Sequence, residues 1–595
     1  MQLKLLFREK PKPAAVIMFV MLLLALAVRL YGIDFGKPYL YHVDEWKLVN
    51  QAGHLLDVKH LNKDVLFRLG TYPPFFTYLL AFAYGIFAVV GLVTGFFPSM
   101  SSIAEYYRTN PFTFHFIGRL ICVVMGTATI QILYLAIKNL YNRKVAILSA
   151  LFLAFMFIHV RNSHYSTVDI PVTFFIVTAF YFMTRIIKEN KSRHYILAGV
   201  FSSLAIATKY NVVFIVVTLL LAIVFANKRE KKVSLKQLFV NKKVGITAFA
   251  LAFTFLVACP ISWIDTGKFL PIFEKNLSSQ HKGKVGLGGK DFWSYITGEQ
   301  WQGFGHTSRN SMAGAMGKPI MILSLLGTTY CLLRHRRQDL LLISFPILLY
   351  VLHGNMSYKA MRHLLPALPF LVAAAAVLLD ALITKWLVGF RKQHIALSLC
   401  TTVIVVPMII DVLQYDFFLT KTDTRTLAAE WIEKNIRPGA KIAVDFYYPQ
   451  VYNRNKIFST IGPRLSKHST IVSISDPNID NDTVRQYELY DTNYLDFFWG
   501  PDRRIEKGPV QMITAESIEY VITDSWTSFR FYSKSALKKY PILCKQRQKY
   551  YTWVEENFNL LKELVGDEAK TPGPTIRIYK KMNEFVYCDT TNGEI

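Results

Sequence analysis

The chain has 595 residues, of which 52% are hydrophobic and 14% are aromatic. Its many uninterrupted apolar runs exclude a water-soluble protein for most of the sequence and indicate membrane-spanning helices. The formal net charge is +27, but Lys and Arg are enriched in cytoplasmic loops, where they attract anionic headgroups of membrane lipids, so we expect no nucleic-acid partner.

The first apolar run extends from Ala14 to Leu30 and predicts an uncleaved membrane anchor. Cations precede it at Lys4, Arg8, Lys10 and Lys12, and no small-residue cleavage site follows. The positive-inside rule then places the N-terminus in the cytoplasm of a protein of the cell inner (plasma) membrane, with residues 32 onward outside.

The remaining apolar runs predict a polytopic α-helical membrane protein. Five clusters of Lys and Arg lie between these runs and are typical of cytoplasmic loops. The odd number of spans that this pattern gives places the C-terminal region outside the cell. About 11 transmembrane helices are expected, near residues 13–31, 112–136, 145–162, 169–186, 195–210, 211–226, 244–263, 318–333, 340–353, 364–384 and 395–415.

The apolar stretch from Phe75 to Phe97 conflicts with this alternation. Its length would permit a span, but a full crossing would move every later basic cluster to the outside. We therefore expect it to lie along the membrane or to re-enter from the outer face.

The first outer loop, residues 32–111, carries the adjacent carboxylates Asp44 and Glu45 just beyond the first span. One interpretation is structural, because Asp is a favoured N-cap and Glu45 to Leu56 has a helical pattern. The other is chemistry at the membrane surface, which gains weight from further polar residues predicted on the same side.

A polar hinge from Arg161 to Pro171 is also predicted outside, between two apolar spans. It contains His164 and Asp169, and a carboxylate beside a span is costly unless it is paired or functional. A helix cap at Asp169, with Pro171 in the first turn, is the structural alternative.

Two further outer turns carry cations against the positive-inside trend. Lys209 lies between two apolar runs, and Arg362 and His363 precede another. Such cations would hold a lipid phosphate through charge-assisted hydrogen bonds, with Arg the more rigid of the two types. The alternative is that their side chains extend to the lipid headgroups.

The long outer loop, residues 264–317, is rich in Gly and aromatic residues, as binding loops often are. His281 in this loop would ligate a metal together with a carboxylate, although a surface or substrate-contacting His is the simpler interpretation. Among the cysteines, Cys544 and Cys588 lie in the outer region, and their spacing leaves a disulfide open.

The composition changes after Tyr415, which predicts a transmembrane domain over residues 1–415 and an extracytoplasmic α/β domain over residues 416–595. We expect a structural role for this second domain ahead of substrate recognition. Its predicted elements are a helix at 424–435, strands at 441–446, 470–473, 520–523 and 575–579, and a helical pattern around 551–564.

Together, these outer motifs resemble the membrane-embedded GT-C glycosyltransferases, and most of all the group of protein O-mannosyltransferases and aminoarabinose transferases (glycosyltransferase family 39-like). The resemblance extends from residue 13 to about 440. It rests on His42 to Trp46, Tyr72-Pro73-Pro74, His164-Tyr165 with Asp169, Ala207 to Tyr210, and Arg362 with Leu365-Pro366. Aminoarabinose transferases have Glu-Lys before the Pro-Pro pair, whereas this chain has Thr71-Tyr72, so a metal or phosphate contact there is not transferred.

The resemblance implies that a sugar is transferred from a polyprenyl-phosphate carrier to an acceptor hydroxyl at the outer face, with an acidic residue of the first loop essential. Asp44 would be the general base, and Glu45 would orient the loop or contact the sugar. The predicted substrate-binding residues are Asp169, Lys209, Arg362, His363, Tyr72 and His164.

A direct displacement would invert the anomeric configuration, and cationic side chains or a divalent cation would stabilise the leaving phosphate. The acceptor stays open between a protein, a glycolipid and a polysaccharide. A transporter or flippase of lipid-linked sugars and a noncatalytic envelope assembly protein are the alternatives.

Overall fold

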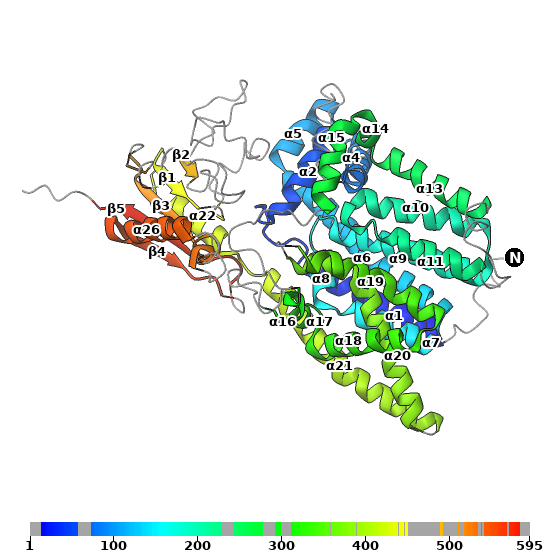
Figure 1. Cartoon of the computed structure of the whole chain (residues 1–595). Helices are drawn as coiled ribbons and strands as arrows, with labels where there is room; N and C mark the ends of the chain where they lie inside the picture. Colours follow the sequence, from blue (N-terminus) through cyan, green and yellow to red (C-terminus); the bar gives the residue numbers. More distant parts are fainter. Residues whose placement is uncertain are drawn as a thin grey trace, which may run out of the picture. The chain divides into compact units, whose positions relative to one another are not determined.

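The structure is a computed structural model of the whole chain (Figure 1). It describes residues 13–56, 73–227, 242–277, 292–298, 311–356, 359–387, 389–437, 439–445, 447–449, 488–491, 510, 513–514, 517–532, 537, 541–567 and 571–582. The chain forms two compact units, and the main division between them falls after Thr420.

The first unit is helical. Its long helices are α1 (Pro13–Leu30), α4 (Phe75–Val93), α6 (Pro111–Leu140), α9 (Asp169–Glu189), α10 (Ser192–Thr208), α11 (Ile215–Asn227), α13 (Lys242–Ala258), α18 (Lys318–Arg334), α19 (Arg337–Gly354), α20 (Leu368–Trp386) and α21 (Phe390–Leu419). Shorter helices join them: α2 (Val43–Leu56), α5 (Met100–Thr109), α7 (Arg143–Ala154), α8 (Phe157–Ser163), α14 (Ile261–Ile264), α15 (Thr266–Leu277), α16 (Ser294–Thr297) and α17 (Met312–Met316), with the 3₁₀ helices η2 (Tyr210–Val212) and η4 (Met361–Ala367).

Among the described residues, seven helices are long and apolar enough to cross a membrane, or eight if a bent pair counts as one span. The bent pair is α7 with α8, which meet at 57° inside the stretch predicted as one span over 145–162. The chain is therefore a multi-pass membrane protein. The number of candidates is smaller than the roughly 11 spans predicted from the sequence: the spans predicted over 195–210 and 244–263, for example, correspond to α10 and α13, helices of 17 residues that are not among these candidates.

The helix α4 occupies the apolar stretch from Phe75 that we expected to lie along the membrane or to re-enter. It has 19 residues and is one of the seven candidate spans. Its length and composition therefore do not support the expectation that this stretch does not cross.

Helix α9 is central to the first unit, because α6 and α10 both pack along it (Figure 1). Glycines on α6 let the polar hinge after α8 come close. A Cβ on Gly126 would lie 2.6 Å from Ser163 Oγ, and a Cβ on Gly118 would collide with Ser166. Small residues at these positions thus bring the hinge and the start of α9 against α6.

The second unit contains a five-stranded sheet of order β2-β1-β3-β5-β4. The strands are β1 (Lys441–Val444), β2 (Glu488–Asp491), β3 (Tyr520–Asp524), β4 (Phe558–Leu564) and β5 (Ile576–Lys581). β1 pairs in parallel with β2 and β3, whereas β5 is antiparallel to β3 and β4. The helices of this unit are α22 (Thr424–Asn435), α24 (Ser525–Ser528) and α26 (Pro541–Asn557), with the 3₁₀ helix η6 (Phe529–Tyr532).

One predicted element of the second unit is wrong in part. The helical pattern assigned to 551–564 ends with α26 at Asn557, and Phe558 to Leu564 forms the edge strand β4. Pairing with β5 decides the conformation there, because tertiary hydrogen bonds override a weak local pattern. The strand predicted at 470–473 lies outside the described residues, as does Cys588, whereas Cys544 is buried.

Candidate active site

The first turn of α2 carries both adjacent carboxylates, and neither residue is its N-cap, because the helix begins at Val43. Glu45 is buried against Arg119 of α6. The guanidinium donates from Nε to Oε1 at 2.9 Å and from Nη2 to Oε2 at 2.8 Å. Both side chains are almost fully inaccessible, so this is a bidentate ion pair inside the protein.

The remaining hydrogen-bonding capacity of this pair fixes the surrounding loops. Arg119 Nη1 donates to the carbonyl oxygens of Ile33 and Phe35 at 2.8 and 3.1 Å, and the backbone amide of Ser166 donates to Glu45 Oε1 at 2.7 Å. Burial alone raises the pKa of the Glu45 carboxyl, but the charge and hydrogen bonds of Arg119, aided by neighbouring histidines, bring it below its ordinary value. The carboxylate is therefore ionised and holds the outer loop, the hinge and α6 together.

Asp44 lies in a different environment from its neighbour. Its Oδ2 is 2.9 Å from Nη1 of Arg362 on η4, and the two side chains are 42% and 33% exposed, respectively. Because successive side chains on a helix diverge by about 100°, burial of Glu45 leaves Asp44 facing an open surface. This carboxylate is accessible to a reactant.

Asp169 and Lys209 form a third ion pair. Lys209 Nζ donates to Asp169 Oδ1 at 2.8 Å, with side chains 14% and 6% exposed. α9 begins at Asp169 and its N-cap is Val168, so the carboxylate contacts a cation instead of capping the helix. Two residues predicted separately are thus brought into contact.

Aromatic rings line the backbone near Asp44. His42 stacks on Tyr165 with ring centroids 4.1 Å apart, and the hydroxyl of Tyr165 is 2.5 Å from that of Tyr415. Burial lowers the pKa of His42; the charges of Arg362 and Arg119 act in the same direction, whereas Glu45 and Asp44 oppose it. His42 is therefore neutral at physiological pH, with its ring held flat on a tyrosine.

The other predicted residues are placed less directly. His164 is buried, and its ring nitrogens lie 2.9 and 3.0 Å from the carbonyl oxygens of Tyr31 and Val160, so its contacts in the structure are structural. His363 follows Arg362 on η4, with its ring 5.1 Å from that of His353. Tyr72 and His281 lie outside the described residues.

The elements that carry these pairs meet at one end of the helical unit. η4, with Arg362, packs against α9, which begins with Asp169, and the Ser166 amide on Glu45 is three residues before that helix. Carboxylates and cations thus come from four segments far apart in the chain. A site that holds an anionic leaving group beside a proton acceptor requires this combination.

No group of three or more His, Cys, Asp or Glu side chains suited to a metal ion comes together within the described part of the chain. The carboxylates of the site are instead paired with arginine or lysine. The predicted ligand His281 is not among the described residues, so the residues that are described do not make up a metal site.

The sequence interpretation missed Arg119. This residue lies in the middle of an apolar run, and the run was read only as a predicted span. An arginine in such a run is costly unless it is paired with a carboxylate, so its presence was a signal for a buried ion pair.

Comparison with protein families matches residues 114–260 to the family described as dolichyl-phosphate-mannose-protein mannosyltransferase. The matched segment contains Arg119, the polar hinge, Asp169 and Lys209. Comparison with curated proteins gave no match.

Several solved structures are similar to this chain at low identity. The apo oligosaccharyltransferase from Archaeoglobus fulgidus has 12% identity and a TM-score of 0.46, with 73% of this chain and 63% of that chain covered. Apo ArnT from Cupriavidus metallidurans has 10% identity and a TM-score of 0.48, with 95% and 98% covered. The Pmt1–Pmt2 protein O-mannosyltransferase complex of S. cerevisiae, bound to the sugar donor, has 19% identity and a TM-score of 0.29, with 48% and 37% covered.

The chain spans less than two thirds of the length of the archaeal oligosaccharyltransferase, and all three TM-scores are below 0.5, so we base no step on these superpositions. The family match stands without them. It falls on the segment that supplies three of the six ion-paired residues described above, namely Arg119, Asp169 and Lys209. The resemblance to the protein O-mannosyltransferase group that the sequence indicated is therefore confirmed over residues 114–260.

Proposed function

We propose that this protein is a glycosyltransferase that moves a sugar from a polyprenyl-phosphate-linked donor to an acceptor hydroxyl at the outer membrane face, with inversion at the anomeric carbon. The observation that carries the proposal is the exposed Asp44 carboxylate beside Arg362, next to a buried carboxylate that fixes the loop. The family match over residues 114–260 supports the class of donor.

Asp44 is the general base in this proposal. The acceptor oxygen attacks the anomeric carbon, its proton passes to an Asp44 oxygen, and the bond between that carbon and the phosphate oxygen breaks with the electron pair on the phosphate. A hydroxyl is a poor nucleophile near neutral pH, so a positioned base contributes about 10² to 10⁴ in rate.

Arg362 Nη1 lies 2.9 Å from Asp44 Oδ2, and a guanidinium carries five N–H donors in a planar fork, so a second anion can compete with the carboxylate for it. A donor phosphate that takes part of this guanidinium loosens the pair and makes the carboxylate available to the acceptor proton. Developing negative charge on the leaving phosphate is then stabilised where proton transfer also takes place.

Lys209 is the second phosphate contact, and Asp169 is a positioning residue. The buried carboxylate holds Nζ at 2.8 Å and restricts a flexible side chain to one direction. An ammonium fixed in advance stabilises the leaving group without being reorganised during the reaction. Glu45 is likewise a positioning residue: it holds Arg119 and the outer loop in place and touches no reactant.

The finer parts of the sequence interpretation belong to this proposal. They are eleven spans, a cytoplasmic N-terminus and an extracytoplasmic domain over residues 416–595 with a structural role. Tyr72, His164 and His363 as substrate contacts also remain proposals, and so does a protein or glycolipid acceptor. Two of the similar structures hold a lipid phosphate, although no step of the proposal rests on them: ArnT from C. metallidurans was determined bound to undecaprenyl phosphate, and the A. fulgidus enzyme with a dolichol-phosphate and an inhibitory peptide.

A divalent cation on the leaving phosphate, which the sequence interpretation allowed, stays a proposal and takes no part in the steps above. The A. fulgidus oligosaccharyltransferase was determined in complex with Zn and sulfate. In this chain the described residues make up no such site, so every step above uses side chains alone.

The test is transfer of labelled sugar by the purified full-length protein, from a panel of synthetic polyprenyl-phosphate sugars to membrane extracts. Asp44→Asn keeps the shape of the side chain and removes proton acceptance, and we expect a loss of about 10² to 10⁴ in turnover. Asp34→Asn is the matched control, because Asp34 is an exposed carboxylate of the same loop.

Equal turnover by Asp44→Asn and wild type would remove Asp44 as the base, and a product with retained configuration would contradict the single displacement. Movement of the lipid-linked sugar across vesicles without transfer to any acceptor would favour a transporter or flippase. Absence of both activities from a folded protein would favour an assembly protein.

A further inference from the structure

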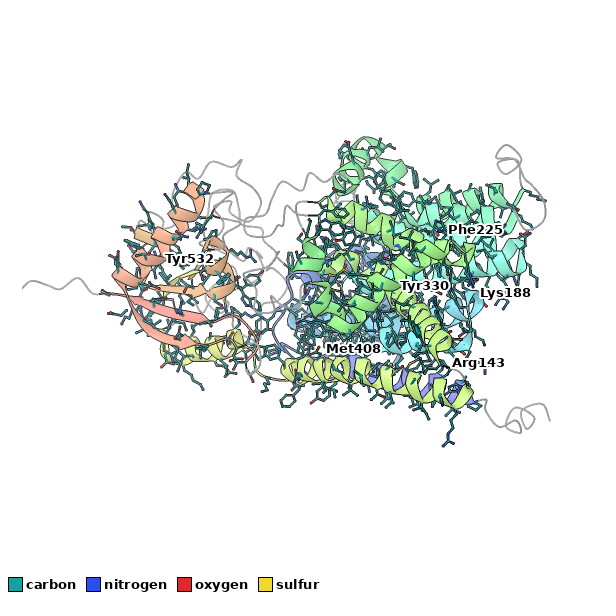
Figure 2. The ribbon with its side chains drawn as sticks, turned by 60° about the horizontal axis from the view of Figure 1, so that its bottom comes forward. Arg143, Lys188, Phe225, Tyr330, Met408 and Tyr532 are labelled. Carbon is teal, nitrogen blue, oxygen red and sulfur yellow. The ribbon has the colours of Figure 1, made fainter. Side chains whose placement is uncertain are left out.

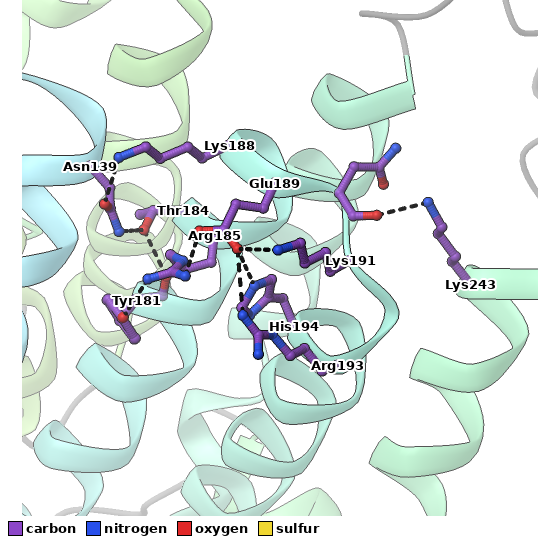
Figure 3. Close-up of polar contacts among 11 residues, drawn as sticks. Asn139, Tyr181, Thr184, Arg185, Lys188, Glu189, Lys191, Arg193, His194 and Lys243 are labelled. Atoms are coloured by element: carbon purple, nitrogen blue, oxygen red, sulfur yellow. Dashed lines mark hydrogen bonds and ion pairs between the residues drawn. The ribbon is translucent and has the colours of Figure 1, made fainter.

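Basic side chains gather at the turn between α9 and α10, at the far end of α9 from the candidate active site. Figure 3 shows Arg185, Lys191 and Arg193 around one carboxylate, that of Glu189, with Lys188 and Lys243 bonded to neighbouring residues. The members of this basic cluster are Arg185, Lys188, Lys191, Arg193 and Lys243, with His194 beneath them.

The position of the basic cluster follows from the length of α9. A helix of 21 residues is about 32 Å long, close to the hydrocarbon thickness of a bilayer. Asp169 of the candidate site begins this helix and Glu189 ends it. The cluster therefore lies at the opposite membrane face, at the level of the lipid headgroups.

The neighbouring helix α6 ends at the same face. Asn139, near the end of α6, accepts a hydrogen bond from Lys188 at 3.4 Å and donates to Thr184 at 3.0 Å. Arg143 follows four residues later, and Figure 2 shows it at the same end of the helical unit as Lys188. The excess of positive charge thus extends from α9 and α10 onto the start of α7.

The carboxylate of Glu189 forms hydrogen bonds with only some of its cationic neighbours. It accepts hydrogen bonds from Arg185 and from His194, but Lys191 and Arg193 approach it only to 3.7 and 3.8 Å. These two side chains are 61% and 63% exposed. A charge-assisted hydrogen bond is about 2.8 Å long, so at these distances neither cation makes one to the carboxylate.

The inner cations are held in place before any anion arrives. Arg185 donates to the hydroxyl of Tyr181 at 3.0 Å, and Lys243 donates to the carbonyl oxygen of Asn190 at 2.9 Å. The Lys243 ammonium also lies 5.7 Å from the ring centre of Tyr195. Tyrosine rings at this level are typical of a membrane interface, and fixed cations lose little entropy when they bind.

We propose that this basic cluster binds the phosphate group of an anionic phospholipid. A lipid phosphate is favoured over a soluble anion because the cluster lies at the end of a helix of bilayer length, where headgroup phosphates are concentrated. Lys191 and Arg193 would reach the phosphate oxygens from the open side. This site is separate from the proposed active site and does not depend on glycosyl transfer.

The test compares phosphatidylglycerol with phosphatidylcholine on the full-length protein in micelles, with the dissociation constant of each lipid measured by native mass spectrometry. The variant is Lys191→Gln with Arg193→Gln, two exposed residues whose removal leaves the buried contacts intact. Arg336→Gln with Arg337→Gln is the matched control, because these are two exposed arginines at the start of α19.

We expect wild type and control to bind phosphatidylglycerol with the same preference over phosphatidylcholine. In the variant, the affinity for phosphatidylglycerol should fall about fivefold for each cation removed. An equal loss in variant and control would overturn the proposal, because it would show a general effect of charge. No preference in wild type, or full competition by inorganic phosphate, would overturn it as well.

Discussion

The adjacent residues Asp44 and Glu45 in the first turn of α2 lie in opposite environments, one at the surface and one buried. Glu45 and its partner Arg119 are inaccessible, and three backbone groups from two segments complete their hydrogen bonds. Asp44 and its partner Arg362 are 42% and 33% exposed, and Asp44 Oδ2 lies 2.9 Å from Arg362 Nη1. Both are pairs of a carboxylate with an arginine, but Glu45–Arg119 is fixed inside the protein, whereas Asp44–Arg362 is at the surface and can separate.

The difference is one of solvation. Two charges taken out of water depend on each other, so removal of one leaves the other buried and uncompensated. Two charges at the surface are each hydrated, so their separation costs little. We therefore assign a role in folding stability to the buried Glu45–Arg119 pair (the buried side) and a role in catalytic turnover to the Asp44–Arg362 pair (the open side). The predictions below test this division of roles.

The largest expected effect on folding is on the buried side. Glu45→Gln removes the charge that compensates Arg119, and breaking such a pair costs about 3–5 kcal/mol of unfolding free energy. Denaturant unfolding of the protein in mixed micelles measures this loss. A double variant, Glu45→Gln with Arg119→Met, should recover part of it, and additive losses would contradict a coupled pair.

Lys209 tests whether a largely buried ion pair, Lys209 with Asp169, also contributes to turnover. Lys209→Met keeps the aliphatic length and removes the charge, so we expect a 10²- to 10³-fold loss of turnover, as for removal of one preorganised donor to a developing anion. Lys209→Arg should recover part of the activity. Unchanged turnover in the Met variant would remove Lys209 from the phosphate site.

Acid should weaken the buried side selectively. The pKa of Glu45 in the folded protein is below its ordinary value of 4.5, so the stability it contributes is present above that value and is lost as pH falls through the folded pKa. The thermal midpoint of the wild type should therefore drop below about pH 4.5, and Glu45→Gln should lack this part of the drop. An identical acid profile in both proteins would contradict the assignment.

The smallest expected effect is on the stability of the open side. Asp44→Asn should change the unfolding free energy by about 1 kcal/mol or less, because an exposed ion pair is worth no more than that. Its coupling to Arg362 in a double-mutant cycle should shrink further at high salt. A loss of several kcal/mol would mean that Asp44 supports the fold, and the division would fail.

Sequence reasoning predicted the helices well because long apolar runs bounded by cations leave few alternatives. Each predicted span corresponds to a helix or to a helix pair in the structure. The partners of the charged residues were beyond its reach, since Glu45 and Arg119 are 74 residues apart and only packing of α6 against the loop brings them together. Strand β4 was missed because its conformation depends on pairing with β5.

The site residues divide in the same manner. Asp169 is a candidate because a carboxylate beside a span is costly, and Lys209 because it goes against the positive-inside trend; both are local signals. That they contact each other is a property of the hairpin of α9 and α10, whose two open ends meet. Local chemistry therefore indicated which residues matter, and tertiary structure decided how they pair.

The position of Glu45 depends on Gly118, a residue of the apolar helix α6. A methyl group at that position would push on Ser166, whose amide holds Glu45, although Gly118 itself touches no reactant. Natural variation there should be as narrow as at a catalytic position. A survey of tolerated substitutions would therefore show position 118 to be as restricted as a catalytic residue. The cause would be steric, because any larger side chain there would displace Ser166.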